Sequence, residues 1–479
     1  MDASKVEEKT NFMDRLSGDK VVWIIFLCLC MFSLVSIFSS TSLMATEEHS
    51  RFDIMRGQFV TYLLGAVTIF LCFRIKKIKW FKLASKYMFI LTFAMLAILV
   101  SHKSIGFIRP MPINGAWRVL KVGGLQIHVF EFAKVAMVMY LAWAVDTLQK
   151  DRFHLVKELA KIDRLSFLDK EIWKEIIYIY GPIMTVTVLV LTGGASSAVF
   201  TAGIMFLTIL IGGVNLKHAA AMIVVGMGMM AGCVGLYLLT SHGGKDNEHA
   251  FFPRIGVVCG RLGLIKGEDE DDVDDLKKFL AAKEGSRDYY DALDMIRQPI
   301  GAKIAIHEGG FFGKGAGQST QKYIVPIMYE DYMFSFIVEE YGLLGGILVI
   351  MLYISLLARG SLIARNCDNN FAKIAVAGLC LLITAQAMFH IVINSDLGIL
   401  TGQTLPLISH GTSSFICFCA AFGVILSISR MAEEKMQQIS DNAGPLVPEE
   451  TASDDEVKDN LSALSDFESG LEFTDNDIL

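Results

Sequence analysis

Apolar residues along this chain are gathered into long blocks that are separated by polar stretches. Each block is about 18–25 residues long, the length that a helix needs to cross a hydrocarbon core of roughly 30 Å. We therefore predict an all-α integral membrane protein with about ten transmembrane helices. The helices are expected near residues 21–43, 58–74, 84–101, 129–147, 175–192, 194–213, 219–240, 332–357, 371–394 and 412–430.

The composition agrees with a membrane protein. Of the 479 residues, 53% are hydrophobic and 19% are charged, whereas a soluble domain carries about 25% charged residues. The formal net charge of −7 is concentrated in an acidic run at 267–275 and in the tail after Met431. It therefore does not point to a particular partner, and we expect no nucleic-acid partner. The nine cysteines show no paired spacing that indicates a zinc site or a disulfide framework.

Basic residues predict the orientation of the chain. They are dense at 74–82 and 150–174, on the same side of the membrane as the N-terminus, and Arg359 and Arg365 join them there. By the positive-inside rule this side is cytoplasmic. Because the predicted number of helices is even, both termini are expected in the cytoplasm.

This orientation divides the chain into three parts. A cytoplasmic N-terminal segment covers residues 1–20, and a polytopic membrane domain covers 21–431. The tail at 432–479 is rich in Asp, Glu and Ser, so we expect it to be disordered. Two outer segments remain, at 102–128 and at 241–331, and the second is a large extracytoplasmic loop between the seventh and eighth helices.

Charged residues stand out on the outer side and at the start of the next helix. Arg109, Arg118 and Lys121 either contact lipid head groups or form an anion site, because guanidinium groups bind phosphate oxygens through paired donors. Glu131 and Lys134 share one helix face at i, i+3 spacing. Charges inside a membrane helix are costly, so these two form either a structural ion pair or part of a polar substrate cavity.

Carboxylates and a histidine are the candidate catalytic groups. Glu330 and Asp331 lie where the large loop enters the eighth helix. The helix dipole favours a carboxylate there for purely structural reasons, but the position also suits a general base that faces the outer surface. The loop at 401–415 contains Pro, Gly and hydroxyl residues, which indicate irregular backbone that lines a cavity. His410 in this loop is either a hydrogen-bonded structural residue or a group that titrates near neutral pH.

Several motifs, in sequence order, resemble those of the SEDS family (shape, elongation, division and sporulation) of polytopic peptidoglycan glycosyltransferases. The match runs from about residue 114 to 429, and independent motifs recur at corresponding loop positions. The segments that carry it are NGAWR (114–118), FEFAKVAMVMYLA (130–142), GGVNLKH (212–218), GGFFGKGAGQSTQKYIVP (309–326), EDYMFSFIVEEYG (330–342) and VINSDLGILTGQTLPLISHGTSS (392–414).

The resemblance implies roles for particular residues. Asp331 matches the family's catalytic aspartate, and no protein metal site is expected. The chain departs from the family where His410, Gly411 and Thr412 replace Tyr-Gly-Gly, and where Val119 replaces a tryptophan. The candidate substrate-binding residues are Arg109, Arg118, Lys121, Glu131, Lys134, Lys314, Gln318, Ser409, His410 and Ser413.

The resemblance also implies a reaction at the outer leaflet of the bacterial inner membrane, namely the polymerisation of lipid II. Asp331 would remove the proton of the acceptor's GlcNAc 4-hydroxyl, a poor nucleophile without a base. The oxygen would attack the donor's MurNAc, and undecaprenyl pyrophosphate would leave. That leaving group needs cationic stabilisation, which Arg109, Arg118, Lys121 or a divalent cation such as Mg²⁺ or Mn²⁺ would supply.

Partners and alternatives follow from the same resemblance. The segment GDKVVWIIF (18–26) resembles a division-type member, which implies a septal location, a class B penicillin-binding transpeptidase as partner and contacts with other divisome membrane proteins. An elongation-type homologue is the near alternative. A lipid II flippase or transporter without polymerase activity, or a catalytically silent scaffold, would also have many transmembrane helices.

Overall fold

The computed structural model describes the following part of the chain: residues 17–41, 51–113, 116–153, 156, 161, 169–240, 287–325, 327–395, 397 and 402–442. The acidic run at 267–275, the first 16 residues and the tail from 443 onward lie outside the described residues, so the expectations for them stay untested.

Long helices occupy the positions of all ten predicted transmembrane segments. Seven of the helices in the described part of the chain are long and apolar enough to cross a membrane, and two shorter apolar helices lie in α9 and α10. The remaining predicted segment is α5, which differs from the others because it carries buried charged residues. The helices are α2 (Lys20–Ser40), α3 (Arg51–Phe73), α4 (Ile78–Ser101), α5 (Val129–Gln149), α7 (Glu171–Glu175) continued by the π-helix η3 (Ile176–Tyr180) and α8 (Gly181–Leu191), α9 (Ala195–Ile211), α10 (Leu216–Thr240), α15 (Met333–Arg365), α16 (Asn370–Asn394) and α17 (Thr412–Asn442).

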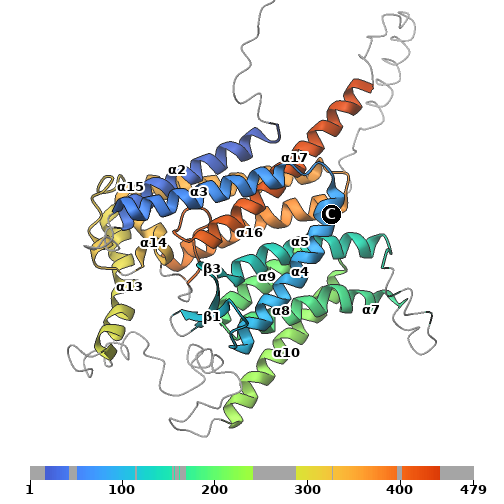
Figure 1. Ribbon diagram of the computed structural model, residues 1–479, viewed down its shortest axis with the longest axis horizontal. Helices are drawn as coiled ribbons and strands as arrows, with labels where there is room; N and C mark the ends of the chain where they lie inside the picture. The colour runs from blue at the N-terminus through green and yellow to red at the C-terminus, as the bar shows by residue number, and fades with distance from the viewer. Residues whose placement is uncertain are drawn as a thin grey trace, which may run out of the picture. The chain divides into compact units, whose positions relative to one another are not determined.

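The centre of the helical core is formed by α5 and α16. α5 packs against α4, α9 and α16, and α15 packs against α2 and α16 (Figure 1). Most residues of α5 are buried, including small side chains such as Ala133, Ala136 and Ala144 that permit close helix approach. This burial explains why α5 tolerates the charges of Glu131, Lys134 and Asp146, which would be costly in contact with lipid.

A small antiparallel sheet fills the first outer segment and was not predicted from the sequence. It consists of β1 (Ile108–Ile113), β2 (Ala116–Val122) and β3 (Leu125–His128) in the order β1-β2-β3. Gly123, with a φ of 62°, begins the tight turn between β2 and β3, a conformation that glycine adopts without steric cost. The sheet packs against α4 and α5 (Figure 1), and β3 leads directly into α5.

The described end of the large outer loop is more ordered than the sequence suggested. It forms α13 (Arg287–Gly309), the 3₁₀-helix η5 (Gln321–Tyr323) and the short helix α14 (Met328–Asp331), and α13 packs against α15. α15 is interrupted at Gly342, whose φ is 71°. The backbone N–H groups of Lys314 and Gly315 donate to the carbonyls of Glu339 and Glu340, each at 2.9 Å, next to this interruption. The glycine-rich segment at 309–317 therefore packs directly on the backbone of α15.

The chain divides into two compact units, residues 1–432 and 433–479. Of the second unit, the structure describes only residues 433–442, which are the last part of α17. The predicted end of the last helix near residue 430 was therefore too early. Polar residues with good helix propensity, such as Glu433, Glu434 and Lys435, continue the helix where the hydrophobic pattern has already stopped.

Candidate functional site

A polar cavity of about 110 Å³ lies where several segments that are distant in the sequence meet. Arg118 reaches it from β2, Glu131 from the start of α5, Asp331 from α14, and Gly402 from the irregular loop before α17. Backbone without regular structure at 402–411 confirms the expectation for this loop. The complete lining is Arg118, Val119, His128, Phe130, Glu131, Ser197, Ile327, Glu330, Asp331, Gly402, Gln403, Thr404, His410, Gly411 and Ser414.

Asp331 is held at the end of α14, just before the membrane helix α15 begins. Its N–H donates to the carbonyl of Ile327 at 3.2 Å, and its own carbonyl accepts from the Asn394 side chain at 3.1 Å. Ile327 has a φ of 56°, in the left-handed region that a β-branched residue rarely adopts. Strain of about 1–3 kcal/mol at such a position is typical of sites where the surrounding structure fixes a functional group.

The environment of Asp331 raises its pKa to about 7. Burial of the carboxylate is the main cause, because desolvation disfavours the charged form, and the negative charge of Glu330 adds to it. The guanidinium of Arg118 acts in the opposite direction. A carboxylate with a pKa close to neutral is suited to accept a proton from a hydroxyl at physiological pH.

Arg118 and Asp331 both lie close to Gly402. A Cβ atom on Gly402 would lie 3.2 Å from Nη1 of Arg118 and 3.5 Å from each carboxylate oxygen of Asp331. The Arg118 Nε donates to the carbonyl of Gly193 at 3.4 Å, which ties β2 to the turn between α8 and α9. The site therefore combines a base and a cation that both lie close to the Cβ position of Gly402.

Glu131 and Lys134 form the centre of a buried polar network beneath the cavity. The Lys134 ammonium donates to Glu131 at 2.7 Å, to Gln386 at 2.6 Å and to Gln403 at 3.0 Å. Gln403 in turn donates to Ser197 at 2.8 Å. The ion pair is confirmed, and Glu131 also lines the cavity, whereas the use of this cavity by a substrate stays a prediction.

His410 lies on the other side of the cavity, beside Glu330. Its Nδ1 is 3.6 Å from Oε1 of Glu330, and its ring meets Tyr329 edge to face. The backbone N–H of His410 donates to the backbone carbonyl of Tyr329 at 2.9 Å. The hydroxyl of Ser409 donates to the backbone carbonyl of Glu330 at 2.7 Å. These bonds attach the loop before α17 to α14, so Ser409 has a positioning role.

Ser413 also supports the site from outside the cavity. Its hydroxyl accepts the N–H of His128 at 3.0 Å, which joins the start of α17 to the end of β3. The neighbouring Ser414, which the sequence analysis did not single out, lines the cavity instead and contacts Thr404.

Seven of the ten predicted substrate-binding residues do not line the cavity, namely Lys134, Ser409 and Ser413, which support it, and four others. Arg109 and Lys121 are cross-strand partners on β1 and β2, and neither lines it. Lys314 is engaged in ion pairs with Glu308 and with Glu339, the latter at 3.0 Å. The fourth, Gln318, has an exposed side chain in the same glycine-rich segment.

Some residues of the site carried no clear signal in the sequence. Gln386, Gln403 and Ser197 are uncharged and lie on three different elements, so only the fold brings them together with Lys134. A glutamine in the apolar sequence of α16 is the one sign that was available for Gln386, since a buried amide in a membrane helix needs a hydrogen-bond partner. Gly402 could be recognised only from the geometry around it.

The described residues contain no dedicated cluster of metal-ligating side chains. No group of three or more His, Cys, Asp or Glu side chains there is placed to hold a metal ion. The carboxylates available at the cavity are Asp331, Glu330 and Glu131, of which Glu131 is already paired with Lys134.

Comparison with known proteins gives a consistent result. The family model FTSW_RODA_SPOVE, described as a cell cycle protein, matches residues 19–247 and 288–434. The probable peptidoglycan glycosyltransferase FtsW of Trichlorobacter lovleyi is 26% identical over 413 residues, which cover 86% of this chain and 93% of the relative. Stage V sporulation protein E of Bacillus subtilis is 26% identical over 422 residues, with coverages of 87% and 98%.

Two solved structures share the fold. A chain from a peptidoglycan synthase complex has a TM-score of 0.58 at 19% identity, and the match covers 87% of this chain and 99% of that one. The rod shape determining protein RodA of Thermus thermophilus has a TM-score of 0.50 at 19% identity, with coverages of 87% and 97%. The likeness supports the polytopic helical architecture.

Proposed function

Because the chain belongs to the FtsW/RodA/SpoVE family of cell cycle proteins, we propose that it is a peptidoglycan glycosyltransferase that polymerises lipid II during cell division. The names of relatives that cover most of the chain support this proposal. The observation that carries it is the placement of the Asp331 carboxylate, with a pKa near 7, opposite Arg118 in one polar cavity.

In the proposed reaction Asp331 acts as the general base. It takes the proton of the acceptor's GlcNAc 4-hydroxyl while that oxygen forms a bond to the anomeric carbon of the donor's MurNAc. The bond between this carbon and the pyrophosphate breaks, and undecaprenyl pyrophosphate leaves with the electron pair. Arg118 is the cation at the cavity that would stabilise the developing negative charge. The cavity lies next to the ends of membrane helices, where a lipid-linked substrate can enter from the bilayer.

The proposal includes a divalent cation, although the described residues form no dedicated metal site. Mg²⁺ is commonly bound by one or two carboxylates together with substrate phosphates, and Glu330 and Asp331 are the carboxylates that would share it here. Such an ion would help to neutralise the pyrophosphate. Activity that is unaffected by a chelator would remove the ion from the mechanism.

The test of the catalytic proposal is polymerisation of labelled lipid II by the purified protein and by Asp331→Asn. The variant is expected to lose at least about 100-fold in rate, because loss of a general base costs about 10²–10⁴. Asp169→Asn is the matched control, since the Asp169 side chain is 60% exposed and does not line the cavity. Equal rates for Asp331→Asn and the parent protein would refute the catalytic role. Transport of lipid II into proteoliposomes without polymerisation would instead support the flippase alternative.

We further propose that both termini are cytoplasmic and that the cavity faces the outer side. Arg359 pairs with Asp19 at 2.5 Å, and Arg430 donates to the carbonyl of Ile75 at 3.1 Å. These contacts gather the start of α2, the α3–α4 turn and the ends of α15 and α17 at one end of the helices. The density of basic residues at this end supports a cytoplasmic orientation. Labelling of single introduced cysteines by an impermeant reagent in whole cells tests it.

The proposed partner is a class B penicillin-binding transpeptidase, within a set of divisome membrane proteins at the septum. One of the solved structures that share the fold belongs to a peptidoglycan synthase complex that coordinates polymerization and crosslinking, which is the kind of assembly that we expect. Septal enrichment of a fluorescent fusion supports the division-type assignment. A dispersed signal along the wall would favour the elongation-type homologue.

A further inference from the structure

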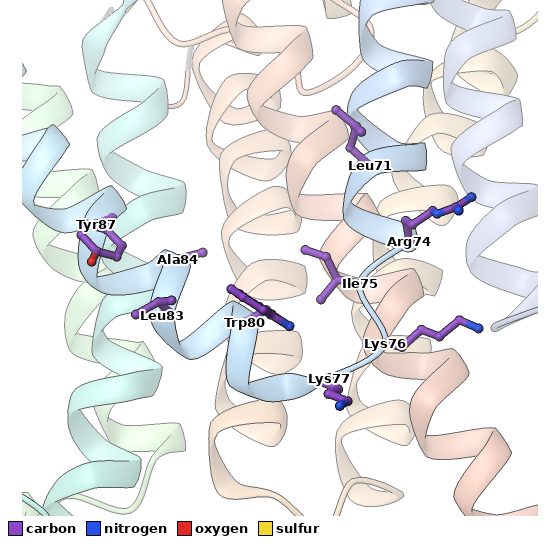
Figure 2. A pocket seen from close by; sticks show the side chains of 9 residues that line it. All are labelled: Leu71, Arg74, Ile75, Lys76, Lys77, Trp80, Leu83, Ala84 and Tyr87. Atoms are coloured by element: carbon purple, nitrogen blue, oxygen red, sulfur yellow. The ribbon is translucent and has the colours of Figure 1, made fainter.

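A second and larger cavity, of about 670 Å³, lies at the turn between α3 and α4. We call it the α3–α4 turn cavity. Figure 2 shows Ile75 and Trp80 between the two helices, Leu83 and Tyr87 further along α4, and Lys77 at the turn itself. No carboxylate lines it, so it has none of the groups of the Asp331 cavity.

The cationic residues of this cavity differ from other basic residues in the same region. Lys82 and Lys150 both pair with Asp146, each at 2.5 Å. By contrast, Arg74, Lys76 and Lys77 all line the cavity, and none of them forms an ion pair within the part of the chain that the structure describes. The positive charges of these three residues are therefore available to bind an anionic ligand.

The remainder of the lining is aromatic and aliphatic. Trp80 is 59% exposed and Tyr87 is 65% exposed, and Leu83 is exposed beside them. Trp and Tyr are enriched where the head groups of a bilayer meet its apolar interior. A ligand that matches this lining has a negatively charged head and an apolar body.

The position of the cavity favours a lipid over a soluble anion. α4 has 24 residues, so its two ends lie about 36 Å apart. The cavity lies at the first end, and the sheet that carries Arg118 packs against α4 and follows its other end. The two cavities thus lie near opposite faces of the membrane, and the α3–α4 turn cavity is near the face with the dense basic residues, where anionic lipids are attracted.

We propose that the α3–α4 turn cavity binds one anionic phospholipid of the leaflet on its own side. The phosphate would contact Arg74, Lys76 and Lys77, whose long side chains can turn toward a head group. An acyl chain would lie along the exposed surface of Trp80 and Leu83. The binding site is separate from the proposed glycosyltransferase reaction and does not depend on it.

The test is native mass spectrometry of the full-length protein in detergent, titrated with dioleoyl phosphatidylglycerol and with dioleoyl phosphatidylcholine. The parent protein is expected to bind one phosphatidylglycerol more tightly than phosphatidylcholine. The triple variant Arg74→Gln, Lys76→Gln, Lys77→Gln is expected to bind it at least about tenfold more weakly, since each such charge contributes about 1 kcal/mol near an anionic lipid surface.

A matched control removes the same number of charges elsewhere. Lys79, Lys170 and Lys217 are exposed and do not line the cavity, so their triple Gln variant should bind phosphatidylglycerol as the parent does. Unchanged binding in the first triple variant, or an equal loss in the control, would overturn the proposal. If glycerol 3-phosphate displaced bound phosphatidylglycerol as effectively as additional phosphatidylglycerol does, the cavity would be a site for a free anion and not for a lipid.

A measurement on the unaltered protein keeps the proposal testable if the first triple variant does not fold. Binding of phosphatidylglycerol should weaken as salt rises, because the head group is held by partly exposed charges. Binding that is equal for the two lipids at every salt concentration would refute the site.

Discussion

The Arg118 guanidinium and the Asp331 carboxylate both lie next to Gly402, which has no side chain of its own. A Cβ atom there would contact both groups, at 3.2 Å from Arg118 and 3.5 Å from Asp331. Arg118 lowers the pKa of Asp331 while burial and Glu330 raise it. The balance leaves a pKa of about 7, so the protonation state of Asp331 depends on its cationic neighbour.

This relationship leads to a prediction about pH. A general base acts in its deprotonated form, so the parent protein's kcat/KM for lipid II polymerisation should be full above pH 7 and fall as the pH drops through about 7. Arg118→Gln removes the positive charge that lowers the pKa, so the acid limb of its profile should move to higher pH. Arg118→Lys should restore part of the shift. The measurement is the initial rate at a series of pH values.

The direction of the shift separates this role from a merely structural one. If Arg118 only supported the fold, Arg118→Gln would lower the rate by the same factor at every pH. An acid limb that stays in place, or moves to lower pH, would contradict the electrostatic coupling.

The space at Gly402 gives a second prediction. Gly402→Ala should reduce polymerisation by about tenfold or more, because the added methyl would contact both the base and the cation, and a displacement of about 1 Å in such a site costs about 100-fold. The thermal stability should change little, since Gly402 is exposed. Gly124→Ala is the control, because nothing lies within 4 Å of its Cβ position. Equal activity of both variants would show that the space is not used.

The sequence predicted the helices better than the outer segments, for a physical reason. A membrane helix must be long and apolar in its own sequence, so its position can be found locally, as for α15 and α16. The sheet at 108–128 depends on strand pairing and turn geometry. Without knowledge of the strand register, nothing in the sequence distinguished Arg109 and Lys121 from Arg118 as candidate substrate contacts. Lys121 is paired with Arg109 in the ladder, whereas Arg118 is the residue skipped at a register shift of the β1–β2 pair, and only Arg118 of the three lines the cavity.

The site itself was predicted in part. Asp331 and Glu131 were found because a carboxylate in or beside an apolar helix is rare and needs an explanation. Lys314 was assigned to the substrate from the resemblance, but it pairs with Glu339, which lies 25 residues further along the chain. Contacts of this kind follow from the kink in α15, and nothing in the local sequence around Lys314 indicates them.

The buried charges of α5 give a third prediction, on stability. Lys134→Met leaves the Glu131 carboxylate without its cation in a buried position, and should lower the free energy of unfolding by about 3–5 kcal/mol. Replacing both, as Glu131→Gln with Lys134→Met, should recover a large part of the loss because no unpaired charge is left. Thermal unfolding in detergent measures both. A double variant less stable than Lys134→Met alone would contradict the account.

The interruption of α15 gives the last prediction. Gly342 has a φ of 71°, and a Cβ atom there would lie 2.3 Å from the carbonyl oxygen of Phe311 and 2.4 Å from the nitrogen of Gly313. Gly342→Ala therefore strains its own backbone and pushes away the glycine-rich segment, so it should cost at least about 2 kcal/mol of stability. The freed segment should become sensitive to protease.

Gly203→Ala is the matched control for this change. Gly203 lies within α9, and nothing is within 4 Å of its Cβ position, so alanine should leave stability unchanged or raise it by up to about 1 kcal/mol. Limited proteolysis and thermal unfolding of the two variants separate loss of the close backbone contact from a general effect of replacing glycine in a membrane helix. If both variants behave like the parent protein, the contact between the glycine-rich segment and the kink of α15 does not hold the outer loop in place.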